Sequence, residues 1–350
     1  MTTHNIAIYI DSLAGGGAER VMIDLATEMV ARGHQVHFFL LESVIDHSLP
    51  SSIPIHILDI KGKRSQFTGY FQLNKTARVM TRLVREVENT IGAFDLHLVN
   101  LDSSNQVVNR CNFTNVYYVI HNSIEQELSR AAKRNPFRYL RTRREKRMLD
   151  GKHLIAVSQG VADEAKQSRL FRPASVRIIY NPCDIPTIQR LAEESNLDIP
   201  NQPYLIHIGR AVRQKRHDIL FQALKLVPDI KLVLLCKNIK KVRKLAEQAG
   251  VTDRIITPAF QTNPYNWIKH ARLMVFSSDF EGLGMVLIES LICGTQVVST
   301  DCDFGPREIL TGKLADFLVP TGEPEALAAK INEALNTRID TLNAAIIHKV

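Results

Sequence analysis

Residues 5–31 read NIAIYIDSLAGGGAERVMIDLATEMVA. The run Ile6–Ile10 is short, apolar and rich in isoleucine, which predicts a buried β-strand. In Ala18–Ala31 the apolar residues recur every three to four positions, which predicts an amphipathic helix. Three consecutive glycines separate the two segments and predict a tight turn. A strand that passes through a glycine turn into a helix is the repeating unit of a parallel α/β sheet.

The same alternation continues along the chain. In the first half, further strands are predicted over residues 36–41, 55–58, 96–100, 116–120, 154–157 and 176–180. In the second half, strands are predicted over residues 204–208, 231–235, 254–256, 273–276 and 296–299, with helices over residues 217–227, 239–249, 263–270 and 285–293. We therefore expect an α/β protein with two doubly wound, Rossmann-like domains that face an interdomain cleft.

The domain bounds follow from a break in this alternation. Prolines and polar residues fill residues 181–203, which predicts a hinge between a first domain at residues 1–180 and a second at residues 204–336. Residues 337–350 form a short C-terminal segment that we expect to pack back on the first domain. Because parallel sheets bind ligands at the carboxyl ends of their strands, a small-molecule site is expected in the cleft.

Composition narrows the classes of protein. Of the 350 residues, 45% are hydrophobic and 23% are charged, which excludes a disordered, collagen-like or coiled-coil chain. The net charge is 44 − 36 = +8, so an anionic partner is expected: a phosphorylated ligand, a membrane surface or a nucleic acid. Five cysteines without a C-x-x-C pair predict a reduced, cytoplasmic protein without a zinc site. Neither a signal peptide nor a membrane-spanning run is recognisable, so membrane contact should be peripheral.

Two glycine-containing loops follow predicted strands and suit a phosphate group. Gly16 and Gly17 open the first helix, where backbone amides and the helix dipole favour negative charge. Gly209 ends the first strand of the second half, and Arg210 and Lys215 lie in the loop that follows. A forked guanidinium and a point charge together suit a diphosphate. A plain strand-to-helix turn and a solvated basic loop are the competing interpretations.

A third loop combines two carboxylates with glycines. Residues 280–290 read FEGLGMVLIES, so Glu281 lies in a glycine loop and Glu289 in the apolar helix after it. Carboxylates accept hydrogen bonds from sugar hydroxyls, while the loop amides and the helix N-terminus attract phosphate. An unpaired charge on an apolar helix would be costly, which favours a functional role for Glu289.

Two further features lie in the first half. His121 follows the strand predicted over residues 116–120, at the ligand-binding edge, although a lone histidine is more often structural. Residues 130–147 contain nine Lys or Arg among eighteen residues, with Phe137 and Leu140 between them. This pattern predicts a basic amphipathic helix that contacts an anionic membrane or a phosphorylated acceptor. A solvated surface is the competing interpretation.

Together these motifs resemble the retaining glycosyltransferases of family 4, which have the GT-B fold. The family's E-x7-E signature matches Glu281 and Glu289, in the context FEGLGMVLIES…CGTQVVSTDC…GPREIL. The turn GGAER, the loop GR…QK and the stretches AVSQGV and IYNPCD also match. The resemblance spans nearly the whole chain.

The resemblance implies a role for each site. The second domain would bind a nucleotide sugar, with UDP as the expected nucleotide, and the first domain would bind the acceptor. Four residues would be catalytic: Glu281, His121, Arg210 and Lys215. The donor would contact Gly16, Gly17, Arg210, Lys215, Glu281, Gly282, Leu283, Gly284, Met285 and Glu289. Arg210 and Lys215 would hold the diphosphate, Glu281 the transferred sugar and Glu289 the ribose, with His121 near the sugar. No metal or cofactor is implied, because the cations and the helix dipole would stabilise the leaving diphosphate.

The implied reaction is the transfer of a hexose or N-acetylhexosamine to a glycan or glycolipid acceptor. The expected setting is lipopolysaccharide core or other surface-polysaccharide synthesis at the cytoplasmic face of the inner membrane, with peripheral contact through residues 130–147. Two alternatives stay open, a GT-B nucleotide-sugar epimerase and a non-enzymatic module that binds anionic ligands. Specific nucleic-acid binding is not expected, because no such motif is present and aromatics total 7%. Glu281→Ala is expected to abolish transfer with little loss of folding stability.

Overall fold

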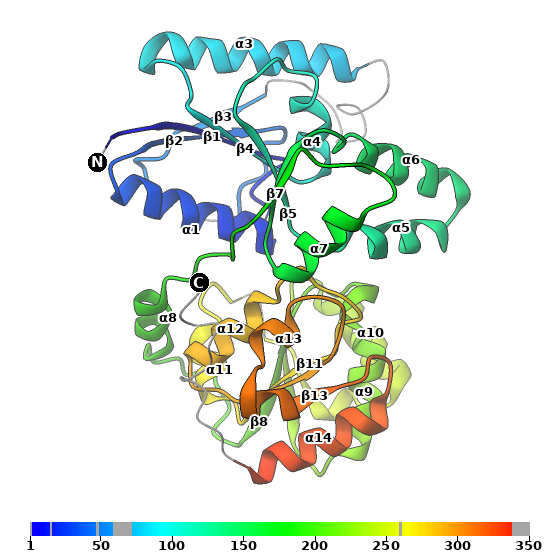
Figure 1. Ribbon diagram of the computed structural model, residues 1–350. Coiled ribbons are helices and arrows are strands. Elements are labelled where there is room, and N and C mark those ends of the chain that lie inside the picture. The colour runs from blue at the N-terminus through cyan, green and yellow to red at the C-terminus, as the bar shows by residue number, and fades with distance from the viewer. Residues whose placement is uncertain (1, 15, 47–48, 59–71, 259–260, 338–350) are drawn as a thin grey trace. The chain divides into compact units, whose positions relative to one another are not determined.

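The computed structural model describes residues 2–14, 16–46, 49–58, 72–258 and 261–337 (Figure 1). By its internal contacts the chain divides into two compact units, residues 1–182 and 183–350. Each unit is built around one parallel sheet with helices packed on it. The predicted doubly wound α/β architecture is therefore confirmed for both halves. The predicted cleft between them stays a prediction.

The first unit contains a seven-stranded sheet in the order β3-β2-β1-β4-β5-β6-β7. Its strands are β1 (Asn5–Ile10), β2 (Gln35–Leu40), β3 (Ile55–Ile57), β4 (Leu96–Asn100), β5 (Val116–Ile120), β6 (His153–Ala156) and β7 (Ser175–Ile178). In the centre, Ile6 of β1 is in register with Val36 and Leu96. Because β1 is buried along its length, it can be a continuous apolar run rather than an alternating one.

The helices of the first unit connect these strands. They are α1 (Gly17–Ala31), α3 (Leu73–Ile91), α4 (Asp102–Val108), α5 (Ile124–Ala132), α6 (Pro136–Arg147) and α7 (Gln159–Gln167). Figure 1 shows α1 on the opposite side of the sheet from α3. Ser123 and Ser158 cap α5 and α7, because each hydroxyl accepts a hydrogen bond from a backbone N–H of the first turn.

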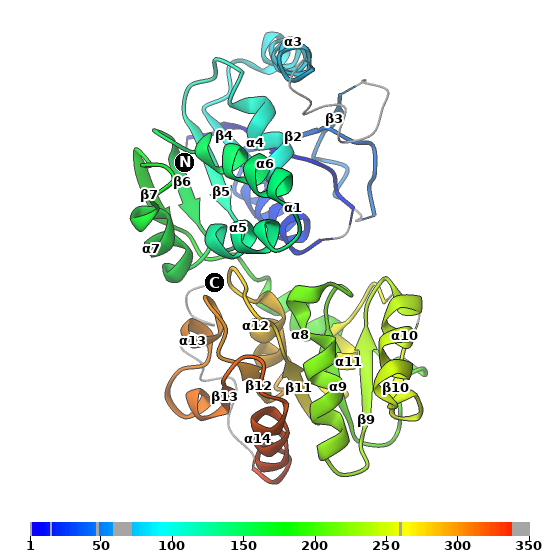
Figure 2. The same cartoon turned by 90° about the vertical axis from the view of Figure 1, so that its right-hand side faces the viewer.

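The second unit contains a six-stranded sheet in the order β10-β9-β8-β11-β12-β13. Its strands are β8 (Tyr204–Ile208), β9 (Lys231–Leu235), β10 (Ile255–Ile256), β11 (Leu273–Phe276), β12 (Val297–Thr300) and β13 (Leu318–Val319). Its helices are α8 (Ile185–Ala192), α9 (His217–Leu226), α10 (Ile239–Ala249), α11 (Tyr265–His270), α12 (Met285–Ile292), α13 (Pro306–Ile309) and α14 (Pro324–Asn336). Short 3-10 turns occupy Arg213–Lys215, Thr252–Arg254 and Gly312–Phe317. Helices α9 and α14 lie side by side on the sheet and share one buried core with it (Figure 2).

The predicted strands occur within two residues of their expected bounds. The segment predicted as a hinge, residues 181–203, contains α8, which packs on α11 within the second unit. Asn263 fastens it there, since its Nδ2 donates to the carbonyl of Leu191 at 2.8 Å. From residue 338 onward, the predicted C-terminal segment lies outside the described residues.

The basic segment differs from its prediction. Instead of one amphipathic helix over residues 130–147, the structure has two helices, α5 and α6. Asn135 separates them, because its side chain caps α6 and the proline after it disfavours helical backbone at Asn135. Helix α6 has no continuous apolar face: Phe137 and Leu140 are exposed, and its buried residue is Lys146. The expectation of a single amphipathic helix is wrong; α6 is a basic surface helix.

Candidate functional site

The loops that follow β8 and β11 bring a lysine and a glutamate together in the second unit. Lys215 ends the 3-10 turn after β8, and Glu281 lies in the glycine loop after β11. The Nζ of Lys215 lies 2.8 Å from Oε1 of Glu281, and 14% and 12% of their side chains are exposed. The same Nζ lies 4.6 Å from the ring centroid of Phe276, a distance suited to a cation–π contact. A buried cation and a buried carboxylate thus stabilise each other at the carboxyl edge of this sheet.

Backbone and side-chain hydrogen bonds join these two loops. The N–H of Asp279 donates to the carbonyl of Gln214 at 2.9 Å, and Nε2 of Gln214 donates to the carbonyl of Phe280 at 2.7 Å. The Ser277 hydroxyl donates to the carbonyl of Lys215 at 2.8 Å. Gln214 is buried, so its amide is a fixed part of the site. Gln214 belongs to the loop GR…QK, but sequence reasoning gave it no role, because nothing in its spacing shows that it reaches a loop 66 residues away.

Arg216 forms a further link between the same loops. Its Nη1 lies 2.8 Å from Oδ1 of Asp279, and its Nη2 lies 2.9 Å from Oδ2 of Asp218. The backbone of Arg216 is left-handed, with φ 44° and ψ 50°, which is uncommon for a residue with a side chain. Sequence reasoning treated Arg216 as part of a basic loop, whereas the structure uses it to fix the loop that carries Lys215.

The glycine loop is shaped by a third segment, which follows β12. Gly284 precedes α12 with φ 89°, a left-handed conformation that glycine adopts without strain. Gly305 has φ 87°, and a Cβ there would collide with the carbonyl of Leu283. The N–H of Glu281 donates to the carbonyl of Asp303 at 3.1 Å. The connections that follow the neighbouring strands β8, β11 and β12 therefore determine where the Glu281 carboxylate lies.

The two other predicted donor side chains of this unit are not part of the Lys215–Glu281 ion pair. Glu289 is half-buried on α12, and Gly282 and Leu283 before that helix are buried, while Met285 begins it half-buried. Arg210 is exposed and forms no ion pair with any described residue. The structure thus unites Lys215 with Glu281 and leaves the guanidinium of Arg210 accessible.

His121 of the first unit is held by a buried asparagine at the carboxyl edge of the sheet. Its Nε2 donates to Oδ1 of Asn100 at 2.8 Å, and Nδ2 of Asn100 donates to the carbonyl of Tyr9 at 3.2 Å. The second bond orients the amide, which assigns the hydrogen of the imidazole to Nε2. Burial lowers the pKa of His121 to about 4, so the ring is neutral at pH 7 and its Nδ1 is an acceptor. Asn100 is a second residue that sequence reasoning missed.

The glycine turn of the first unit begins α1. Gly16 precedes the helix and Gly17 is its first residue, and no side chain caps the first turn. A Cβ on Gly16 would collide with the carboxylate of Glu19, whereas one on Gly17 would meet open space. A side chain at position 16 would therefore displace the Glu19 carboxylate, whereas one at position 17 would not. Gly15 lies outside the described residues.

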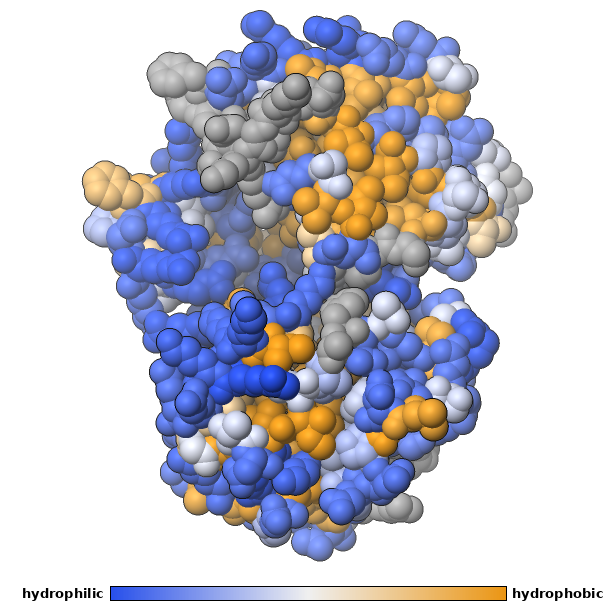
Figure 3. All heavy atoms as spheres, turned by 180° about the vertical axis from the view of Figure 1, so that it is seen from behind, coloured by the Kyte–Doolittle hydropathy of each residue, from blue (hydrophilic) through white to orange (hydrophobic). Residues whose placement is uncertain are grey.

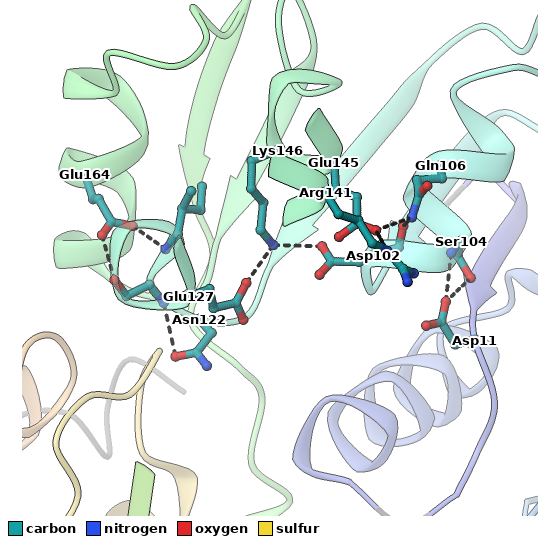
Figure 4. Close-up of polar contacts among 12 residues, drawn as sticks. Asp11, Asp102, Ser104, Gln106, Asn122, Glu127, Arg141, Glu145, Lys146 and Glu164 are labelled. Carbon is teal, nitrogen blue, oxygen red and sulfur yellow. Dashed lines mark hydrogen bonds and ion pairs between the residues drawn. The ribbon is translucent and has the colours of Figure 1, made fainter. Parts of the chain in front are cut away.

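A polar network fastens α6 to the first unit (Figure 4). The Nζ of Lys146 lies 2.7 Å from Oδ1 of Asp102 and 2.7 Å from Oε2 of Glu127. Burial alone would lower the pKa of Lys146, but the two carboxylates more than offset this and raise it. Glu164 of α7 fastens α5 in turn, because it accepts hydrogen bonds from the Ser123 hydroxyl at 2.6 Å and from the N–H of Ile124 at 2.7 Å.

Comparison with known families covers nearly the whole chain. Residues 15–186 match the family described as Glycosyltransferase Family 4, and residues 189–348 match the one described as Glycosyl transferases group 1. The chain belongs to the family 4 glycosyltransferases. The predicted family, fold and enzyme class are thereby confirmed.

Two bacterial relatives illustrate the similarity. The glycosyltransferase is 27% identical over 325 residues to the N-acetylgalactosamine-N,N'-diacetylbacillosaminyl-diphospho-undecaprenol 4-alpha-N-acetylgalactosaminyltransferase of Campylobacter jejuni, covering 87% of this chain and 82% of that one. It is 30% identical over 194 residues to a lipopolysaccharide core biosynthesis glycosyltransferase of Rhizobium meliloti, covering 53% of this chain and 56% of that one.

Solved structures support the fold. The glycosyltransferase resembles Anabaena HepE in complex with UDP and glucose, with a TM-score of 0.69, 21% identity and coverage of 99% of this chain and 93% of that one. It also resembles a glycosyltransferase from Rickettsia africae, with a TM-score of 0.70, 17% identity and coverage of 100% and 91%. Within the described ranges, no helix of the glycosyltransferase combines the length and the apolar character needed to cross a bilayer.

Proposed function

We propose that this glycosyltransferase moves a hexose or N-acetylhexosamine from a UDP-sugar to a membrane-held glycan acceptor, with retention of anomeric configuration, during synthesis of lipopolysaccharide core or another surface polysaccharide. The observation that carries the proposal is the buried pair of Lys215 and Glu281 at the carboxyl edge of the second sheet. A cation held beside a carboxylate provides one group for a departing phosphate and one for sugar hydroxyls.

The donor would be bound mainly by the second unit. Lys215 and the accessible Arg210 stabilise the negative charge that develops on the leaving UDP, and no metal ion is needed for this. Glu281 accepts hydrogen bonds from the transferred sugar, and Glu289 from the ribose. Amides of the segment from Gly282 to Met285 contact the sugar and the phosphates. In the first unit, Gly16 and Gly17 approach the diphosphate, and neutral His121 accepts a hydrogen bond from the sugar through Nδ1.

The relatives support the choice of donor and acceptor. The structure of Anabaena HepE contains UDP and glucose, which favours a UDP-linked donor. The Campylobacter jejuni relative is named for adding N-acetylgalactosamine to a diphospho-undecaprenol-linked sugar, and the Rhizobium meliloti relative for lipopolysaccharide core synthesis. Both names favour an acceptor that a lipid holds at a membrane.

Helix α6 is the part of the described chain that best suits peripheral membrane contact. Phe137 and Leu140 are 85% and 58% exposed, and arginines surround them. In Figure 3 the edge of the first unit that α6 occupies carries a small orange protrusion among blue atoms. Exposed apolar side chains among cations suit the interface of an anionic bilayer.

The membrane contact is tested by replacing both apolar side chains of α6. Phe137→Ser with Leu140→Ser should lower co-sedimentation with vesicles that contain phosphatidylglycerol, because the apolar contribution to binding is lost. The matched control is Leu197→Ser with Leu226→Ser, two exposed leucines of the second unit. Equal binding by both double variants would remove α6 from the proposal.

The reaction itself is tested on the whole chain. A panel of nucleotide sugars is screened for thermal stabilisation, and the ligands found are then offered with lipid-linked glycan acceptors. We expect a UDP-sugar to raise the unfolding temperature and Lys215→Met to lose both this response and transfer. Lys313→Met, at an exposed lysine of the same unit, should keep both. Conversion of the UDP-sugar to its epimer without acceptor would instead support the epimerase alternative.

A further inference from the structure

A groove between α3 and the end of α4 is lined by four arginines that the proposed reaction does not use. Arg78, Arg82 and Arg85 come from α3, and Arg110 comes from the segment directly after α4. The groove has a volume of about 570 Å³. Nη1 of Arg110 donates to Oδ1 of Asn74 at 3.1 Å, which holds this guanidinium at one end of the groove.

The three arginines of α3 share one face. They are spaced four and three residues apart, so they lie on neighbouring turns of the helix. In Figure 3 hydrophilic side chains follow the upper edge of the first unit, where Figure 1 shows α3. At a rise of about 1.5 Å per residue, Arg78 and Arg85 are about 10 Å apart along the helix, so their long side chains allow both guanidinium groups to reach one ligand.

The described residues that line this groove carry a net positive charge. Four arginines and one glutamate, Glu86, give a local charge of 4 − 1 = +3. Glu86 follows Arg82 by four residues, the spacing of a helical ion pair, but no ion pair joins them in the described structure. Other helices do use that spacing, since Arg20 pairs with Asp24 at 2.9 Å.

The unpaired arrangement has a physical cost. Like charges at spacings of three and four residues weaken a helix by about 0.2–0.5 kcal/mol per pair, so an anion bound between these exposed arginines would stabilise α3. Guanidinium groups bind phosphate oxygens through two parallel hydrogen bonds, and several at close quarters suit a multiply charged group. Asn74 and Thr81 add neutral polar groups to the same wall.

We propose that the arginine groove of α3 is a phosphate site of its own, which binds a diphosphate group, either free or at the head of a lipid. The site is distinct in residues from the donor site, because Arg210 and Lys215 belong to the other unit. Its existence does not depend on which nucleotide sugar the enzyme uses.

The direct test is arginine footprinting of the full chain. Inorganic pyrophosphate is added before phenylglyoxal, and peptide mass spectrometry measures the modification rate of each arginine. We expect pyrophosphate to slow modification of Arg78, Arg82 and Arg85 severalfold. Arg190, an exposed arginine of the second unit that pairs with Glu194, is the internal reference. Equal rates with and without pyrophosphate at the three α3 arginines would overturn the proposal.

A triple variant tests the same site by affinity. Replacing all three α3 arginines by glutamine should weaken pyrophosphate binding by about a hundredfold or more, because each charge-assisted contact contributes about tenfold and three are lost. The matched control replaces Lys240, Lys241 and Lys244 of α10 by glutamine, which removes the same charge from another exposed helix surface. Equal weakening in both triple variants would show a general charge effect and refute a site.

Three further ligands in the footprinting experiment show whether the bound diphosphate is free or part of a lipid. These are free UDP, vesicles of phosphatidylcholine with phosphatidylglycerol, and the same vesicles with a polyprenyl diphosphate. Stronger protection by the diphosphate lipid than by pyrophosphate assigns the groove to a lipid-linked ligand, and the reverse assigns it to a soluble one. Protection of the α3 arginines without binding of any UDP-sugar would support the phosphate site and refute the proposed UDP-sugar donor.

Discussion

Replacing Glu281 by glutamine should destabilise the second unit as well as stop transfer. The change removes the carboxylate that lies 2.8 Å from Nζ of Lys215 and leaves that ammonium buried without its counter-charge. The sequence-based expectation was that loss of Glu281 would hardly affect folding. The ion pair changes this expectation, because the lysine has 14% of its side chain exposed and is poorly placed to be solvated instead.

The magnitude follows from the distance and the burial. At an effective dielectric constant of about 20, charges about 3 Å apart attract by about 5–6 kcal/mol before desolvation is counted. Removing one member of a fully buried pair costs about 3–5 kcal/mol. Since 14% and 12% of the two side chains remain exposed, we expect about 2–3 kcal/mol for Glu281→Gln. Lys215→Met should cost a similar amount, because it leaves the carboxylate unpaired.

The assay is a double-mutant cycle followed by urea unfolding of the second unit. The double variant should cost little more than either single change, which corresponds to a coupling energy of about 2 kcal/mol. The control cycle uses Lys330 and Glu333 of α14, whose side chains are 2.7 Å apart but 23% and 52% exposed. That pair should couple by about 0.5 kcal/mol or less. Additive costs for Lys215 and Glu281 would refute the reasoning, since they would show that neither charge depends on the other.

Three other predictions concern a glycine, a buried ion pair and two buried histidines. Gly305→Ala should destabilise the second unit by about 3 kcal/mol or more, because its Cβ would meet a backbone carbonyl. The control Gly294→Ala changes a left-handed glycine that faces open space and should cost about 1 kcal/mol, with urea unfolding as the measurement for both. Lys146→Met should cost about 3 kcal/mol and weaken the attachment of α6, because it leaves two carboxylates without their cation. Hydrogen exchange should become faster in α6, and unchanged exchange would refute the role of Lys146 in attaching this helix. His37 of β2 and His97 of β4 are buried, and burial lowers the pKa of each to about 4. The stability they contribute is full above about pH 6.5 and is lost as the pH falls towards 4, so the unfolding free energy should decline over this window, and less so in His97→Phe.

Most of the fold could be predicted because its signals are local. Strands such as β4 and β5 are short apolar runs bounded by polar residues, and their predicted limits match the observed ones. Strand β13, Leu318–Val319, was missed. The break between α5 and α6 was overlooked although the pair Asn135–Pro136 signals it, because the dense positive charge suggested one continuous helix.

The predicted site residues come from motifs and stay predictions, whereas the contacts that position them could not be read from the sequence. Lys215 and Glu281 each stand out in a loop after a strand, yet their ion pair joins positions 66 residues apart. The amides of Gln214 and Asn100 matter because they reach groups that only the order of the strands brings close, which the local sequence does not show. A parallel sheet places the ends of β8 and β11 side by side, so the sequence shows which loops meet but not which side chains pair.

The number of cations in a segment of the sequence does not show how many of them form ion pairs in the structure. Residues 130–147 hold nine cations, but Lys146 is neutralised internally by two carboxylates and Arg141 pairs with Glu145 at 2.9 Å. The α3 arginines form a shorter and less conspicuous series, but no acidic side chain of the described structure pairs with them. Because unpaired cations attract phosphate most strongly, α3 should contribute more to salt-dependent diphosphate binding per residue than α6 does. Measuring the salt dependence of pyrophosphate affinity in variants of each helix therefore shows how many of the cations on that helix bind phosphate.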